Sequence, residues 1–385
     1  CVFGISHFGL YYLYSSTMPI RHTFLVPKYK RRGKLIMMGC QLAGLLDKGA
    51  KCNTQGRIPW IDNMRGLLIF TVVLGHVISG ENSFLTTAIG YTHYLIYSVH
   101  MSLFFILSGY LSKRNFTFSK VLFNFFLPYA FFDFFYVCWS YLRGMPDSVN
   151  KFIIYPSSVY WFILSLGMIN LLASKISLRG FTILTVFMYI VFSYVPNGSW
   201  EFLALGRTAL MMPAYLIGML LKKYFADFRR YNTWFIVSGV ICIGVELLLA
   251  IRGIVPIYWS THDYNGNNMQ YVMKLLYICF FAFFEFTLLS ICVPNKRCIL
   301  TKWGENSIII YLIHVLFLDI LKTFMISRFG IYWLYWRKWM FPVVILLTAL
   351  LVQFLSLDIW KRIYDIIFSI PQSIWKKISS SIERL

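Results

Sequence analysis

Long, nearly continuous runs of apolar residues alternate with short polar segments along most of the chain. A helix needs roughly 20 mainly apolar residues to cross a hydrocarbon core about 30 Å thick. Transmembrane β-strands are shorter and alternate apolar with polar residues, so the continuous runs argue against a β-barrel. The pattern predicts an all-α, polytopic membrane protein with about ten transmembrane helices. Their windows lie near residues 64–79, 92–112, 119–142, 158–174, 180–196, 203–221, 232–251, 271–293, 304–326 and 339–360.

Lysine and arginine are distributed unevenly between the segments that separate these windows. If the N-terminus is cytoplasmic, the segments on the cytoplasmic side hold 27 of the 36 Lys and Arg residues and the external loops hold 7. Cytoplasmic loops of membrane proteins carry an excess of these residues. The distribution therefore predicts that the N-terminus and the C-terminus both lie in the cytoplasm.

The composition excludes a soluble protein. Hydrophobic residues make up 58% of the 385 residues and charged residues only 13%, whereas soluble domains carry about a quarter charged residues. The formal net charge of +21 would also be typical of a nucleic-acid-binding protein, but topology explains most of the basic residues. We expect the lipid bilayer as a partner and no nucleic acid.

The eight cysteines form no Cys-x-x-Cys pair, and four of them lie inside predicted spans, where cysteine behaves as a small apolar residue. This spacing indicates neither a disulfide framework nor a zinc site. We expect no metal and no bound cofactor.

The two ends of the chain differ from the predicted spans. Residues 1–56 form a basic extension that no positive segment precedes, so a secretory signal peptide is not expected. It is interpreted as a disordered or surface segment, a non-native start or an eleventh span, without a function. Residues 57–360 form the predicted ten-helix domain. Residues 361–385 combine Lys and Arg with tryptophan, which predicts a cytoplasmic amphipathic tail at the inner leaflet.

Five ionisable side chains lie at a similar depth within the predicted spans. Counted from the nearest cytoplasmic basic residue at about 1.5 Å per residue, each lies roughly 16–20 Å into the membrane. Ionisable residues inside spans are costly and are functional candidates for that reason. We therefore expect a polar chamber near the midplane that includes His76, His100, Asp133, Glu285 and His314.

The first span contains the most informative spacing. His76 follows Arg65 by eleven residues, and eleven steps of about 100° bring both side chains to within about 20° of one helix face. Arg65 is a permanent cation with a fork of donors that suits phosphate, and a histidine can act as a general base on a hydroxyl. This arrangement suits a reaction between an anionic cytoplasmic donor and an acceptor from the opposite side.

Several segments resemble a known family. The segment from Arg57 to His76 resembles the opening of the type-3 membrane acyltransferases. The segment from Val99 to Tyr110 resembles that family's second helix, with Val99 and Ser102 where the family has Phe and Pro. Further similar segments follow in the family's order, at Tyr160–Leu164, Met212–Gly218, Gly304–Ser307 and Tyr311–His314. The resemblance covers about residues 57–355 and is closest to the fucose 4-O-acetylase-like branch of this bacterial family.

The resemblance implies a ten-helix enzyme of the bacterial inner membrane. It implies transfer of an acyl group, commonly acetyl from acetyl-CoA as co-substrate, to a hydroxyl of a cell-envelope glycan or its lipid-linked precursor. Arg65 and His76 would be the catalytic pair. The donor-binding candidates are Ser108, Lys113 and Arg114, at the cytoplasmic end of the second helix. Residues expected to bind the acceptor or support the site are His100, Trp161, Glu305, Asn306, Tyr311 and His314.

Most of these residues also have a purely structural interpretation. Arg65, Lys113 and Arg114 are placed as positive-inside anchors would be, and Arg65 is three residues from Asp62. The run that contains Glu305 would also cap a helix. Two other functions stay open: a glycan transporter or flippase, in which the midplane polar layer is a path, and a structural subunit of an export complex.

Overall fold

The computed structural model describes residues 57–78, 88–113, 117–144, 154–192, 194, 202–224, 232–252, 275–329 and 341–382. All regular elements in these ranges are helices. They are α2 (Pro59–Ile78), α3 (Ala88–Tyr110), α4 (Phe118–Val121), the π-helical η2 (Leu122–Phe126), α5 (Leu127–Leu142), α7 (Trp161–Lys175), α8 (Leu178–Phe192), the 3₁₀ turn η3 (Phe202–Ala204), α10 (Leu205–Tyr224), α11 (Asn232–Ile251), the π-helical η5 (Ile278–Ala282), α13 (Phe283–Cys292), α14 (Ile299–Glu305), α15 (Ser307–Phe329), α16 (Phe341–Leu355) and α17 (Asp358–Ile382). The predicted N-terminal extension, residues 1–56, lies outside the described ranges.

The all-α fold predicted from the apolar pattern is confirmed. Each of the ten predicted windows contains a helix. Six helices among the described residues are long and apolar enough to cross a membrane, and the bent pair α16–α17 would make a seventh. Two further apolar helices, α7 and α8, are shorter than a usual span. The count of ten spans stays a prediction.

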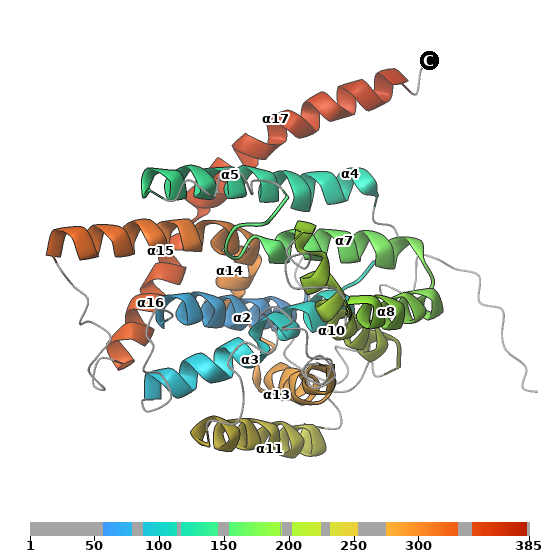
Figure 1. The fold of residues 1–385 in the computed structure, drawn as a ribbon, viewed down its shortest axis with the longest axis vertical. Coiled ribbons are helices and arrows are strands. Elements are labelled where there is room, and N and C mark those ends of the chain that lie inside the picture. Colours follow the sequence, from blue (N-terminus) through green and yellow to red (C-terminus); the bar gives the residue numbers. More distant parts are fainter. Residues whose placement is uncertain are drawn as a thin grey trace, which may run out of the picture. The chain divides into compact units, whose positions relative to one another are not determined.

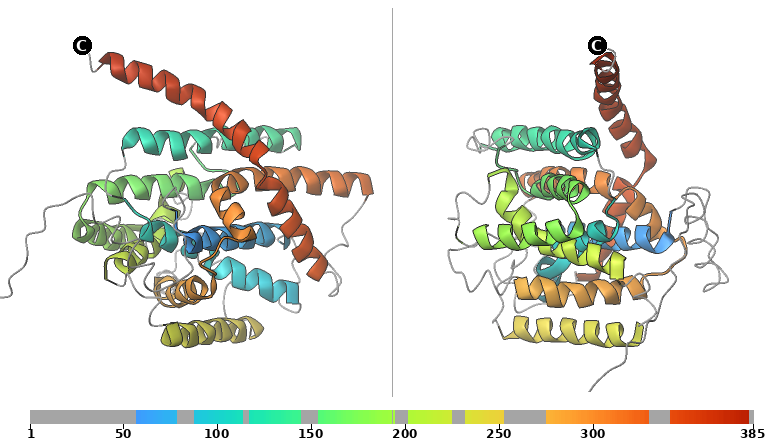
Figure 2. Two further views of the ribbon diagram at one scale, coloured as in Figure 1. Left: turned by 180° about the vertical axis from the view of Figure 1, so that it is seen from behind. Right: turned by 90° about the vertical axis from the view of Figure 1, so that its right-hand side faces the viewer.

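The helices of residues 57–382 pack in layers around α2. In Figure 1, α15 and α7 lie on one side of α2, and α3 and α13 lie on the other. The outermost helices are α11 at one edge and α4–α5 at the other, with α17 crossing beyond α5, and Figure 2 shows the same order from two further sides. Burial follows this order, because 67% of the apolar window of α2 is buried against other helices but only 22% of that of α11.

Glycines allow the closest helix contacts. A Cβ atom added to Gly304 of α14 would lie 1.7 Å from the carbonyl oxygen of Asp62 in α2, and one added to Gly66 would lie 2.0 Å from that of Leu300. Gly109 of α3 faces the backbone of α10 at an equally short distance. Small residues at such positions let helix backbones approach each other within a membrane.

Contacts between distant segments agree with the predicted sidedness. Two partners expected on the cytoplasmic side meet where Lys222 Nζ donates a hydrogen bond to the carbonyl of Ser112 at 2.5 Å. Towards the expected outer side, Arg143 forms an ion pair of 3.0 Å with Asp319. Each contact joins residues that the charge pattern places towards the same side, and the sidedness itself stays a prediction.

Candidate active site

Arg65 lies in the second turn of α2, beside a cavity. Its Nη1 atom is 3.2 Å from Oδ1 of Asp62, and the side chain of Asp62 is 5% exposed whereas that of Arg65 is 37% exposed. Proline is favoured in the first turn of a helix, where its missing N–H has no partner to lose, and α2 begins at Pro59. The helix start therefore fixes a buried carboxylate that orients Arg65, while the guanidinium also reaches the cavity.

The cavity has a volume of about 340 Å³ and a mostly apolar wall. Its charged lining residues are Arg57, Arg65 and Glu305, and two further predicted candidates, Ser108 and Tyr311, also line it. The apolar part comes from four helices and the π-helical η2, and includes Ile69, Phe104, Phe125, Phe162 and Ile308. The arrangement suits a ligand with an anionic end and an apolar arm.

A series of aromatic contacts leads from this cavity to the histidine of the first helix. The rings of Tyr311 and His314, both on α15, are 5.6 Å apart between centroids. The ring of His314 is in turn 5.3 Å from that of His76 on α2. Tyr311 is held from the other side, because its hydroxyl donates a hydrogen bond to the carbonyl of Val159. Two of the predicted histidines are therefore neighbours, and one of them, His314, contacts a residue that lines the cavity.

Tyr97 of α3 lies at the centre of the histidine cluster. Its hydroxyl oxygen is 3.3 Å from Nδ1 of His76. Its ring is 4.2 Å from that of His93, 5.1 Å from that of His100 and 5.9 Å from that of His76. On the opposite side, Lys322 Nζ donates a hydrogen bond of 2.8 Å to the carbonyl of His76. The cluster thus joins α2, α3 and α15 within the bundle.

Backbone contacts indicate which nitrogen is basic in two of these histidines. Nδ1 of His100 is 2.7 Å from the carbonyl of Ile96, and Nδ1 of His314 is 2.7 Å from that of Tyr311. A carbonyl only accepts, so Nδ1 carries the hydrogen in both rings and Nε2 is left as the acceptor. In His314, Nε2 is buried and has no hydrogen-bond partner among the described residues.

Two other members of the predicted midplane layer point elsewhere. Glu285 of α13 forms a side-chain hydrogen bond with Glu246 of α11, and Tyr277 donates a hydrogen bond to the same Glu246. Asp133 accepts a hydrogen bond of 2.8 Å from the backbone N–H of Ser157. The similar depth of the five groups was a correct guide to the three histidines, whereas both carboxyl groups have other partners.

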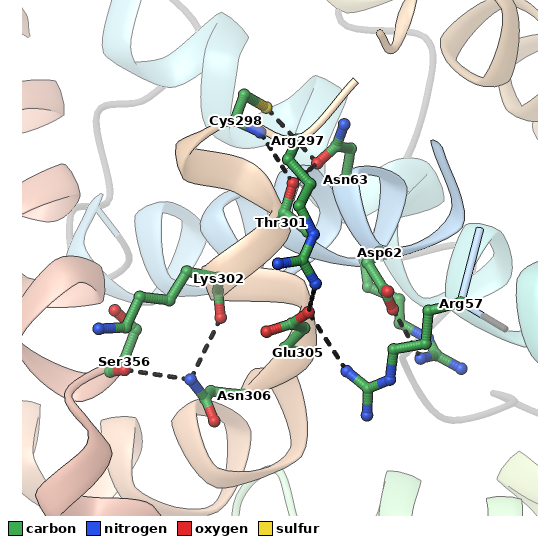
Figure 3. A network of polar contacts seen from close by, with 11 residues as sticks. Arg57, Asp62, Asn63, Arg297, Cys298, Thr301, Lys302, Glu305, Asn306 and Ser356 are labelled. Atoms are coloured by element: carbon green, nitrogen blue, oxygen red, sulfur yellow. Dashed lines mark hydrogen bonds and ion pairs between the residues drawn. The ribbon is translucent and has the colours of Figure 1, made fainter. Parts of the chain in front are cut away.

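Glu305 is shared by two arginines at the cavity's charged end (Figure 3). Its Oε1 accepts a hydrogen bond of 3.1 Å from Arg297 and lies 3.5 Å from Nη1 of Arg57. Asn306, the next residue, donates hydrogen bonds to the carbonyls of Lys302 at 3.3 Å and Ser356 at 3.1 Å. Asn306 therefore joins the turn between α14 and α15 to the end of α16, and Glu305 contacts the cavity.

Asn63 anchors the same region to α2. Its Nδ2 donates hydrogen bonds to the carbonyls of Pro294 at 2.7 Å and Lys296 at 2.8 Å. Its Oδ1 accepts one from the hydroxyl of Thr301 at 2.5 Å. A buried amide with both its ends paired fixes the position of the segment before α14, and thereby that of Glu305.

Two of the remaining candidates, Lys113 and Trp161, do not line this cavity. Lys113 is exposed at the end of α3 and is not among the residues that line the cavity, and Arg114 lies outside the described residues. Trp161 is buried, and the guanidinium carbon of Arg207 is 5.3 Å from the centre of its ring. Arg207 therefore lies over one face of the Trp161 ring.

Sequence reasoning missed His93, Tyr97 and Arg297. A signal for the first two is present, because positions 93, 97 and 100 are spaced by four and three residues and so share one face of a helix. Arg297 was assigned only to topology. Among the described residues, no group of His, Cys, Asp and Glu side chains is arranged to hold a metal ion.

Comparison with known proteins identifies a family. The family model described as an acyltransferase domain, of the type-3 acyltransferases, matches residues 58–360. Comparison with curated proteins and with solved structures found no match. The matched range includes the histidine cluster and every residue that lines the cavity except Arg57.

Proposed function

The chain belongs to the type-3 membrane acyltransferases, and from this premise we propose that it moves an acetyl group from acetyl-CoA to a glycan hydroxyl. The acceptor in this proposal is a cell-envelope glycan or its lipid-linked precursor, and the membrane is the inner membrane of a bacterium. Membrane acyltransfer follows from the family. The donor, the acceptor and the residues' roles are the proposed part.

One observation carries the proposal. The cavity that Arg65 lines at its charged end is bounded by Tyr311, whose ring contacts His314, which contacts His76. Along α2 itself, Arg65 and His76 are separated by eleven residues, or roughly 16 Å. A donor held by its charged end at Arg65 would extend its acyl arm along the apolar wall towards the histidines.

Arg65 would bind phosphate groups of the donor. Guanidinium presents several donors in a fixed plane and stays charged at all physiological pH values, so it pairs well with phosphate oxygens. Asp62 keeps it oriented, since the pair has an oxygen–nitrogen distance of 3.2 Å. Holding the donor in this way removes translational freedom before the reaction, which is a large part of the barrier of a two-substrate step.

His76 would be the general base. With Nδ1–H donated to the hydroxyl oxygen of Tyr97, 3.3 Å away, Nε2 accepts the proton of the acceptor hydroxyl as its oxygen attacks the thioester carbonyl. The new carbon–oxygen bond forms and the carbon–sulfur bond breaks. The imidazolium then returns the proton to the departing thiolate, so the products are the ester and the free thiol. His314 and His100, with their acceptor nitrogens at Nε2, are placed to support this step.

The test is replacement of His76 by Gln, which keeps a polar side chain but has no basic nitrogen. Loss of a general base typically costs about 10²- to 10⁴-fold in rate, so acyl transfer to the glycan should fall by that factor in membranes supplied with acetyl-CoA. Mass spectrometry of the glycan provides the measurement.

A matched control is Thr348→Val in α16. The hydroxyl of Thr348 is buried and bonds only within its own helix to the carbonyl of Val344 among the described contacts. We expect this variant to keep parental activity. Unchanged acylation in His76→Gln, at equal amounts of folded protein, would rule out His76 as the base.

A further inference from the structure

A second, more polar cavity lies between α14 and the first turn of α17. Its volume is about 490 Å³. Three cationic side chains line it, Arg297, Lys302 and Lys361, together with the carboxylates of Glu305 and Asp358. The three cations belong to segments that the charge pattern places on the cytoplasmic side, and the two carboxylates lie at the adjoining ends of predicted spans.

The two cavities have Glu305 in common. Its carboxylate lines the apolar cavity and also the polar one. Figure 3 shows it between Arg57 and Arg297, and its Oε1 lies 3.5 Å and 3.1 Å from nitrogens of these two arginines. Of the two arginines that pair with Glu305, Arg57 lines the apolar cavity and Arg297 lines the polar cavity. The two cavities therefore adjoin at the carboxylate of Glu305.

The charge along this pair of cavities favours an anion with several charges. Five cationic residues line them, against the carboxylates Glu305 and Asp358 and the neighbouring Asp62. Asp358 is 73% exposed and lies 3.9 Å from Lys302, so this pair is long and hydrated and leaves the ammonium group accessible to a ligand. Phosphate groups offer the acceptor oxygens that guanidinium and ammonium groups bind best.

We propose that the polar cavity binds the phosphate-bearing end of the acyl donor, a nucleotide joined through phosphates to a thioester arm, and that the arm passes Glu305 into the apolar cavity. This inference rests on the proposed function. It adds a phosphate contact to the one proposed at Arg65, formed by Arg297 just before α14, Lys302 of α14 and Lys361 of α17, and none at the end of the second helix. Lys113 lines neither of the two cavities.

Glu305 then opposes binding. Its carboxylate already neutralises part of the charge of Arg57 and Arg297, and it repels an arriving phosphate. Removal of this charge should strengthen binding, whereas removal of a cation should weaken it. The two changes act in opposite directions at neighbouring positions, which a general loss of structure would not produce.

The experiment measures the dissociation constant of CoA for the full-length protein in nanodiscs of phosphatidylcholine, by calorimetry. We expect Arg297→Gln and Lys361→Gln each to weaken binding about three- to fivefold, as for loss of one solvent-exposed charge contact. Glu305→Gln should tighten it about twofold to threefold, on the same scale. Lys175→Gln is the matched control, since Lys175 is an exposed cation at the cytoplasmic end of α7 and lines neither cavity.

Pantetheine, which lacks the phosphates, is the second probe. Its binding should be the same in the parent and in all four variants, and raised salt should weaken the binding of CoA but not of pantetheine. Unchanged CoA affinity in Arg297→Gln and Lys361→Gln would overturn the proposal. So would an equal loss for CoA and pantetheine, because the cations would then not contact phosphate.

A lipid headgroup is the other source of phosphate at this surface. Nanodiscs that also contain phosphatidylglycerol distinguish a lipid site from a donor site. If the polar cavity binds a lipid headgroup, Arg297→Gln and Lys361→Gln should retain less phosphatidylglycerol and bind CoA as the parent does. That outcome would also overturn the proposal. The proposed function is tested independently of the phosphate site. His76→Gln tests acyl transfer, and His76 does not line the cavity at α14. A parent-like affinity in the charge variants, with transfer lost in His76→Gln, would refute only the phosphate site.

Discussion

Tyr97 contacts three histidine rings with one side chain, and its hydroxyl faces a ring nitrogen of the proposed base. An imidazole can act at Nε2 only if Nδ1 keeps its hydrogen, and a hydrogen-bond partner at Nδ1 decides this. If His76 is the base, as proposed, Tyr97 would be a positioning residue that acts on the reaction by orienting His76.

We expect Tyr97→Phe to lower kcat about tenfold, since one hydrogen bond of roughly 1 kcal/mol that acts in the transition state corresponds to a factor of that order. The KM for acetyl-CoA should stay as in the parent, because the donor's charged end is bound elsewhere. Steady-state kinetics on purified protein in nanodiscs would provide both constants.

Tyr94→Phe is the control, three residues earlier on the same helix. The hydroxyl of Tyr94 is buried and has no hydrogen-bond partner among the described residues, so its removal should leave kcat unchanged. Equal kcat values in the two variants would show that the hydroxyl of Tyr97 has no part in orienting His76.

Residue spacing was enough to predict that Arg65 and His76 lie on one helix, which is α2; their roles stay a prediction. It was not enough for Tyr97, whose role depends on how α3 faces α2. Glu305 was selected from a motif, but its sharing between Arg57 and Arg297 requires side chains from two segments about 240 residues apart to meet.

At the scale of elements, α2 and α14 together form one wall of the apolar cavity that Arg65 lines. Gly304 of α14 lies against the backbone of Asp62, and Gly66 lies against Leu300, with no space for a methyl group at either position. The same two helices carry Arg65 and Glu305. Their separation would therefore change the shape of the cavity as well as the packing.

Gly304→Ala tests this contact. A Cβ atom at 1.7 Å from the carbonyl oxygen of Asp62 has to move the backbone, and overpacking of this kind costs about 1–3 kcal/mol. We expect a lower temperature of thermal unfolding in detergent, together with weaker CoA binding.

Gly244→Ala in α11 is the matched control for Gly304→Ala, since a Cβ atom at position 244 would meet nothing within 4 Å. Alanine is preferred to glycine within a helix by about 1 kcal/mol, so this variant should unfold at the same or a higher temperature. The contact would be irrelevant to stability if both variants unfolded alike.

The helices themselves were predictable from their apolar runs, and the short elements between them were not. The predicted window 304–326 merges the end of α14 with α15, although Asn306 separates the two helices. A seven-residue helix such as α14 is too short to show a period in the sequence. Its position depends on the side chain of Asn63, which reaches it from another part of the chain.

For the whole molecule, the two ends of the bundle have different chemistry. The cavities lined by Arg65 and Arg297 lie at the end where the predicted cytoplasmic segments meet, and the pair Arg143–Asp319 lies towards the other end. The proposed donor is charged and cannot diffuse across a bilayer, so the proposal requires that it arrive from the cytoplasm.

Oriented vesicles test this sidedness. Added acetyl-CoA should be consumed by inside-out vesicles and not by right-side-out vesicles, unless detergent opens the latter. The measurement is the release of free CoA thiol with time. Equal consumption in both sealed preparations would contradict the assignment of the cavities to the cytoplasmic side.

The hydrogen bonds of Asn63 connect residues that the ribosome synthesises at widely different times. Its partners Pro294 and Lys296 follow it by 231 and 233 residues. At about 5–20 residues per second, the ribosome makes such a stretch in roughly 10–50 s. Throughout that interval α2 exists without α14. A nascent chain that ends before Glu305 lacks a residue that lines both cavities, so neither cavity is complete until this part of the chain has been made.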